Sequence, residues 1–117
     1  MDIVFIHNFE IKTKIGVFEW EHDILQTLIF DIEMAWNNSL PAKTDDITAA
    51  LDYSKVTEFI RFYCQNHQYE LIETLAERLC ENIMLSFAVP WLSMQIKKPG
   101  AIEDAVVGVK IERGQKV

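Results

Sequence analysis

Three side chains that can exchange protons stand where regular structure is expected to begin or end. Glu73 lies in the first turn of an expected helix, Lys98 precedes a Pro-Gly pair after an expected strand, and Tyr53 precedes an expected helix cap. A carboxylate at a pocket edge can accept two N–H bonds from a planar heterocycle. A lysine removed from water can act as a base, and a phenol can donate a proton. These residue types favour general acid–base chemistry.

Each of these residues also has an ordinary structural explanation. Glu73 would favour the positive end of the helix dipole, Lys98 would be a solvated turn lysine, and Tyr53 would be a packed aromatic. Glu21 lies in a polar hairpin tip and would by default be a solvated charge. The residues taken alone leave both interpretations open.

Other kinds of site have less support. The three histidines, His7, His22 and His67, are scattered, and no HxH, HExxH or CxxC spacing joins them, so we predict no metal site. Cys64 and Cys80 fall on apolar helical stripes, which is typical of buried structural thiols. The sequence has no GxSxG, GxxxxGK[ST] or GxGxxG motif. We therefore expect neither a serine nucleophile nor a phosphate-binding loop, and no cofactor.

The composition indicates one ordinary domain, covering residues 1–117. Half of the residues are hydrophobic, and 18 acidic against 11 basic residues give a formal net charge of −7. Nucleic-acid binding is disfavoured, because Lys and Arg do not cluster. The most apolar stretch, residues 83–92, is about half the length of a membrane span, and the opening residues lack a basic signal-peptide region. We predict a soluble, cytoplasmic protein.

Hydrophobic periodicity places these residues on a simple framework. Period-two alternation predicts strands at 11–17 and 28–36, and the polar residues 19–23 form the tip of this hairpin. Residues 37–52 read as a loop with one helical turn near 46–49. Helical spacing follows from a Ser54 cap to about residue 64, and again over 70–87, until Pro90. Strands at 92–97 and 105–112 flank a turn at 98–101.

The resulting ββααββ order predicts an α+β fold, a four-stranded antiparallel sheet with both helices on one face. The other face keeps apolar positions at Ile29, Ala35 and Val106 and the small Gly108. Four strands also leave two sheet edges, which invite pairing. We expect neighbouring subunits to join sheet to sheet, ideally in a closed ring.

Several short segments carry a combined signal along essentially the whole chain. They are IGVFEWE at 15–21, Gln26 with the following strand, TDD at 44–46, LDY at 51–53, LIETLAER at 71–78 and KPGA at 98–101. No single segment is diagnostic, but their ordered combination resembles the dihydroneopterin aldolases of the folate pathway. The resemblance implies the tunnelling fold, in which four ββααββ subunits close their sheets into a barrel and two such rings stack into an octamer.

The resemblance also implies an activity. Members of this family split 7,8-dihydroneopterin into 6-hydroxymethyl-7,8-dihydropterin and glycolaldehyde, and they epimerise the substrate at C2′ to dihydromonapterin, with neither a Schiff base nor a metal. By position in the family, Lys98 would be the acid–base group and Glu21 would orient the substrate side chain or a water. Tyr53 of a neighbouring subunit would assist protonation of the intermediate.

Substrate binding would follow the same correspondence. Glu73 would bind the pterin N3 and 2-amino group, and the backbone at Leu71 and Ile72 would complete this edge. The remaining substrate-binding positions would be Leu51, Asp52 and Val17. One departure concerns the pocket rim: many relatives have a Tyr-His-Gly type of segment after the glycine, whereas Gly16 is followed here by Val-Phe-Glu-Trp.

Two alternatives stay open. A sibling of the same fold epimerises dihydroneopterin triphosphate, although it would need cations for the triphosphate. A non-catalytic, ring-forming pterin-binding protein would share the fold without the chemistry. Zinc-dependent siblings, such as pyruvoyl-tetrahydropterin synthases and GTP cyclohydrolases, are disfavoured by the scattered histidines.

Overall fold

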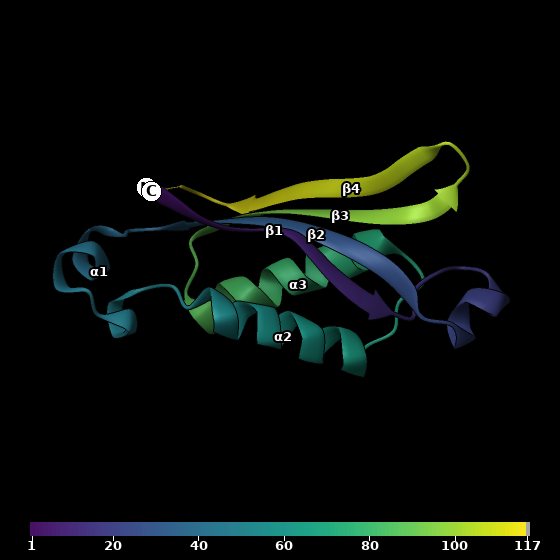
Figure 1. Cartoon of the computed structure of the whole chain (residues 1–117), viewed down its shortest axis with the longest axis horizontal. Helices are drawn as coiled ribbons and strands as arrows, with labels where there is room; N and C mark the ends of the chain where they lie inside the picture. The colour runs from purple at the N-terminus through teal and green to yellow at the C-terminus, as the bar shows by residue number, and fades with distance from the viewer. Residues whose placement is uncertain (117) are drawn as a thin grey trace.

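A four-stranded antiparallel sheet covered on one face by two helices forms the molecule, as the computed structural model of residues 1–116 shows (Figure 1). The sheet order is β1-β2-β3-β4, which confirms the predicted α+β arrangement. The elements are β1 Asp2–Thr13, η1 Glu19–Asp23, β2 Gln26–Trp36, α1 Ser39–Thr44, η2 Ile47–Ala49, α2 Tyr53–Asn66, α3 Ile72–Phe87, β3 Trp91–Ile102 and β4 Ala105–Gly114.

The core lies between the sheet and the helices α2 and α3. Alternate residues of β2 point into it and are fully buried, as period two requires: Leu28, Phe30, Ile32 and Met34. Helical residues spaced three and four apart meet them from the other side, among them Val56, Ile60, Leu75, Leu79 and Ile83. Burying one such side chain contributes about 1.5–3 kcal/mol. This layer therefore fixes how the helices lie on the sheet.

The first strand differs from the predicted one at both ends. It begins at Asp2 instead of residue 11, and the register with β2 shifts between Ile6 and Phe9. Asn8 in this bulge has a φ of 56° and donates its backbone N–H to Asp31 at 2.8 Å. The strand ends at Thr13. Ile15 forms only a single parallel bridge with Tyr69, so residues 14–17 leave the sheet and turn towards the helices.

The helix boundaries correct two further predictions. Asp52, and not Ser54, caps α2, because its carboxylate accepts the backbone N–H groups of Ser54 and Lys55. The short helix α1 was expected to be loop, yet Pro41 falls in its first turn, where the missing N–H has no intrahelical partner to lose. The helical turn expected near 46–49 is present as η2.

The last hairpin is longer than expected. β3 continues through Lys98, Pro99 and Gly100 to Ile102, so the predicted turn at 98–101 is wrong and the reversal occurs at residues 103–104. Pro99 is tolerated because the register between β3 and β4 shifts directly after it, between Pro99 and Ile102. Lys98 consequently stands inside a strand, with a direction set by the sheet.

The open face of the sheet is more polar than expected. Val106 is exposed there, but Ala35 is fully buried, and the centre of the face carries the charged pair Asp31 and Lys97, with Nζ 3.2 Å from Oδ2. β1 and β4 are the two sheet edges. Within residues 1–116, no helix is both long and apolar enough to cross a membrane.

Candidate active site

An ion pair between Glu21 and Lys98 forms the centre of the candidate site. The two residues are 77 positions apart in the chain, and η1 and β3 bring Lys98 Nζ to 2.7 Å from Glu21 Oε2. Glu21 is only 5% exposed, so its default interpretation as a solvated charge is wrong. Because neighbouring strand residues point to opposite faces, Lys98 shares the helix-facing side with buried Ile96, whereas Lys97 points to the open face.

Three hydrogen bonds keep the Glu21 carboxylate ionised. Lys98 donates to Oε2, Gln26 Nε2 donates to the same oxygen at 3.0 Å, and the backbone N–H of Phe18 donates to Oε1 at 3.3 Å. The bond from Lys98, followed by that from Gln26, lowers the pKa of Glu21 from its ordinary 4.5 to about 2, although burial acts in the opposite direction. Glu21 is therefore ionised at neutral pH.

Gly16 leaves the space that this carboxylate fills. Its φ is 142°, which side chains rarely adopt, and a Cβ at this position would overlap the carboxylate of Glu21. Its backbone N–H donates to Tyr69 O at 3.3 Å, and its carbonyl lies 3.1 Å from His22 Nε2. Gly16 thus ties the Glu21 segment to the loop that precedes α3.

A pocket of about 210 Å³ opens beside the ion pair. It brings together six of the nine predicted site residues, and its lining is Val17, Phe18, Glu21, Glu70, Leu71, Ile72, Glu73 and Lys98. Glu73 lies in the first turn of α3, where the backbone N–H groups have no intrahelical partners. The start of α3 therefore offers the pocket a carboxylate and backbone hydrogen-bonding groups, and β3 and η1 offer it an ammonium held by a second carboxylate.

The other three predicted residues lie elsewhere in the subunit. Leu51, Asp52 and Tyr53 stand at the start of α2, which points away from η1 and towards the side of the molecule that α1 occupies (Figure 1). Leu51 is buried, Asp52 is occupied as the helix cap, and Tyr53 is 61% exposed. A single chain does not bring Tyr53 to Lys98.

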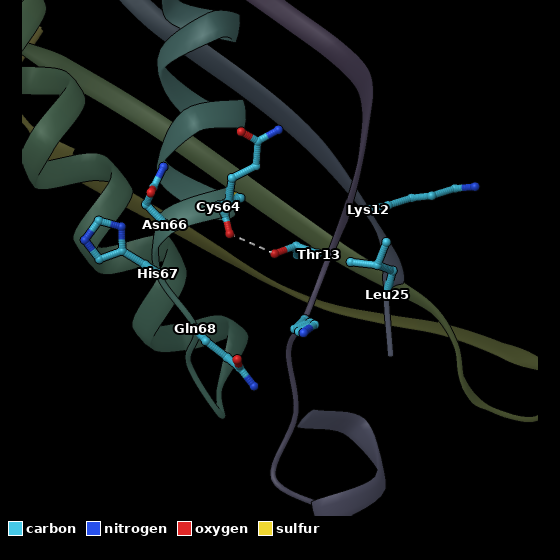
Figure 2. Close-up of a pocket in the computed structure, with 9 residues that line it drawn as sticks. Lys12, Thr13, Leu25, Cys64, Asn66, His67 and Gln68 are labelled. Atoms are coloured by element: carbon cyan, nitrogen blue, oxygen red, sulfur yellow. Dashed lines mark hydrogen bonds between the residues drawn. The ribbon is translucent and has the colours of Figure 1, made fainter. Parts of the chain in front are cut away.

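A larger cavity, of about 380 Å³, lies between the end of β1 and the end of α2. Figure 2 shows the Thr13 hydroxyl on β1 donating to the backbone carbonyl of Cys64, at 3.1 Å, and His67 and Gln68 following from the end of α2. Its lining contains no carboxylate and none of the predicted site residues. The predicted acid–base residues Glu21 and Lys98 therefore line the smaller pocket and not this cavity.

The histidines and cysteines lie apart from this pocket's chemistry. His7 is 3.8 Å from Glu33 on the open sheet face, and His67 stacks on Tyr63. Cys64 and Cys80 are buried, as predicted, and burial raises the pKa of each thiol to about 12. Over residues 1–116, no three His, Cys, Asp or Glu side chains gather in a way that could hold a metal ion.

Sequence reasoning missed the residues that support the ion pair. Gln26 and Gly16 were part of the family-like segments, but their contacts with Glu21 were not predicted, and Glu70 was not assigned to the pocket. Gly16 and Gln26 each lie five residues from Glu21, and this spacing matches no general motif. Only the fold shows that all three converge.

Comparison with known proteins gives one consistent result. The family model FolB, dihydroneopterin aldolase, matches residues 4–112. The curated dihydroneopterin aldolase of Escherichia coli K12 is 42% identical over 118 residues, covering 100% of this chain and 97% of the relative. That of Haemophilus influenzae is 37% identical, covering 97% of this chain and 98% of the relative.

Solved structures agree. A putative dihydroneopterin aldolase from Vibrio cholerae superposes with a TM-score of 0.95 at 45% identity, over 98% of each chain. The E. coli enzyme in complex with neopterin superposes with a TM-score of 0.94 at 43% identity, over 97% of this chain and 100% of that one. The full-length match in sequence and structure means that the chain belongs to the dihydroneopterin aldolase family.

Proposed function

We propose that this dihydroneopterin aldolase cleaves 7,8-dihydroneopterin into 6-hydroxymethyl-7,8-dihydropterin and glycolaldehyde in the pocket beside Glu21 and Lys98. The observation that carries the proposal is the convergence of this buried ion pair and Glu73 on one cavity, from three distant parts of the sequence. A relative of 43% identity is known in complex with neopterin, which supports a pterin as the ligand.

Glu73 and the backbone beside it bind the pterin ring in this proposal. The carboxylate accepts hydrogen bonds from ring N3–H and the 2-amino group, a planar pair of donors that matches two carboxylate oxygens. The backbone at Leu71 and Ile72, at the start of α3, completes the edge. The ring's reacting side then faces Lys98.

Lys98 exchanges protons with the substrate through a water molecule. Removal of the 2′-hydroxyl proton breaks the C1′–C2′ bond, C2′ and C3′ leave as glycolaldehyde, and the electron pair enters the ring's C6=N5 imine. The resulting enamine carbon C1′ then takes up a proton, which gives the hydroxymethyl product. Glu21 orients Lys98 and the water. A positioned acid–base group of this kind contributes about 10²–10⁴-fold to the rate.

The site requires a second subunit. Tyr53 is exposed and does not line the pocket that holds Lys98 of its own chain. The partner subunit's Tyr53, with the backbone near Leu51 and Asp52, would therefore supply the phenol that assists protonation. The two sheet edges, β1 and β4, are the surfaces at which subunits join into a four-membered ring. Two stacked rings give the proposed octamer.

Epimerase activity would follow from the same intermediate. If bound glycolaldehyde reorients before it leaves, its other face can be attacked by C1′. The product then carries the opposite configuration at C2′, which is dihydromonapterin. We expect this activity beside cleavage, and we expect the protein to work in the cytoplasm without a metal.

Incubation of the purified protein with 7,8-dihydroneopterin tests the proposal. We expect glycolaldehyde and 6-hydroxymethyl-7,8-dihydropterin in equal amounts. Epimer formed from dihydroneopterin triphosphate without glycolaldehyde from dihydroneopterin would instead identify a triphosphate epimerase. Pterin binding with no turnover of either compound would identify a non-catalytic binding protein.

A further inference from the structure

The side-chain amide of Gln26 makes two hydrogen bonds at the back of the pocket. Gln26 is the first residue of β2, and its Nε2 donates to the backbone carbonyl of Ile15 at 2.7 Å and to Oε2 of Glu21 at 3.0 Å. One NH₂ group thus uses both of its protons. Gln26 joins a backbone atom to the buried carboxylate.

The backbone end of this link is fixed. Ile15 is 1% exposed and forms a bridge with Tyr69, and the adjacent Gly16 is hydrogen-bonded to the same residue. The carboxylate end is not fixed by its own covalent geometry, because the last torsion of a glutamate is broad and roughly two-fold. The hydrogen bonds of Gln26 therefore restrict the last side-chain torsion of Glu21, because they tie its carboxylate to the fixed backbone of Ile15.

The oxygen that Gln26 holds is also the oxygen that Lys98 contacts. Nζ of Lys98 lies 2.7 Å from Oε2, whereas Oε1 faces the backbone N–H of Phe18. A lysine ammonium sits on a flexible four-carbon stem, so its position depends on the anion that it meets. Moving Oε2 would move Nζ with it.

We propose that Gln26 is a positioning residue for the aldolase reaction, and that it holds Oε2 of Glu21 where this oxygen keeps the Lys98 ammonium at the pocket wall. The inference rests on the proposed function of the pocket. It assigns Gln26 no contact with the substrate, and it makes the reaction sensitive to a side chain behind the ion pair.

Gln26→Met tests the link by keeping the side-chain length and removing both donors. We expect kcat for glycolaldehyde release to fall by about tenfold or more, because small displacements of acid–base groups are costly. KM is expected to stay within about threefold, since the pterin-binding wall is untouched. A kcat within about twofold of the wild-type value would overturn the inference.

Gln26→Glu separates positioning from packing. At low pH a protonated Glu at this position can still donate one hydrogen bond to Glu21, whereas at high pH two neighbouring carboxylates repel each other. We expect the ratio of kcat in this variant to wild-type kcat to rise about tenfold as the pH falls from about 8 to about 5.5. A flat ratio would mean that Gln26 only fills space, even if Gln26→Met folds poorly.

A matched control lies on the opposite sheet face. Gln95 Nε2 donates to Asp31 at 3.3 Å, and Asp31 also pairs with Lys97. This is again a glutamine amide beside a carboxylate–lysine pair, but it lies outside the pocket. Gln95→Met is therefore expected to retain wild-type kcat. Wild-type protein that releases no glycolaldehyde would refute the proposed function itself. Wild-type turnover combined with normal kcat in Gln26→Met would refute the positioning role alone.

Discussion

The buried ion pair makes a specific contribution to stability that depends on pH. Glu21→Gln keeps the shape of the side chain but removes its charge, and it leaves the Lys98 ammonium, whose side chain is 15% exposed, without its anionic partner. Breaking a pair by removing one member costs more than the pair contributes, because the remaining charge is poorly solvated. We expect the variant to fold with lower stability than the wild type.

The pKa of Glu21 sets the size of the effect. A fall from 4.5 in the unfolded chain to about 2 in the folded one corresponds to about 3 kcal/mol, at about 1.4 kcal/mol per pH unit. Solvent that reaches Lys98 through the open pocket reduces this to about 2 kcal/mol. Because the folded pKa is the lower one, the stabilisation is fully present above pH 4.5 and is lost as the pH falls through about 2.

Urea unfolding followed by circular dichroism, between about pH 7 and pH 2.5, measures this contribution. Wild type and Glu21→Gln are compared at one protein concentration, since the proposed subunit association would also affect apparent stability. The difference in unfolding free energy is expected to be about 2 kcal/mol at neutral pH and to shrink to less than half of that by about pH 3. A difference that stays constant over this range would refute the reasoning.

Four further outcomes are expected. Lys98→Ala lowers glycolaldehyde release about 100-fold or more, while the neopterin Kd measured by calorimetry changes less than about threefold. Glu73→Ala is expected to act mainly on binding: the neopterin Kd rises about tenfold or more, since a charged hydrogen-bonding partner is lost. Gly16→Ala places a Cβ against the Glu21 carboxylate and lowers the unfolding free energy by about 2 kcal/mol in urea titrations. Oligomers reassembled from equal amounts of inactive Lys98→Ala and Tyr53→Phe subunits recover about a quarter of wild-type turnover if each site spans two subunits; no recovery would contradict a shared site.

The elements that the sequence predicts well are those whose buried face repeats locally. β2 alternates cleanly from Leu28 to Met34, and α2 and α3 carry apolar residues three and four apart. β1 lacks such a signal, because four consecutive apolar residues, Ile3 to Ile6, occupy both faces and a bulge at Asn8 then changes the phase. β3 passes through Pro99 because pairing with β4 outweighs the local preference for a turn.

For the candidate site, too, the sequence predicted some features and missed those that depend on distant contacts. The family-like segments predicted Glu73, Lys98 and Glu21 as site positions, and the fold brings all three to one pocket. The burial of Glu21 could not be predicted from its polar surroundings, because the ammonium that compensates it comes from a strand 77 residues later. The support from Gln26 escaped prediction for the same reason, since a hydrogen-bonding partner is a property of the folded chain.

Two lysines that are neighbours in β3 meet two different carboxylates on opposite sides of the sheet: Lys97 pairs with Asp31 and Lys98 with Glu21. A slip of one position between β2 and β3 would therefore exchange the two ammonium groups and present the wrong one to the cavity. The backbone ladder that aligns Phe30 with Ile96 decides which lysine faces the pocket. A substitution that shifts the pairing of β2 with β3 can thus remove Lys98 from the pocket without changing any residue that lines it.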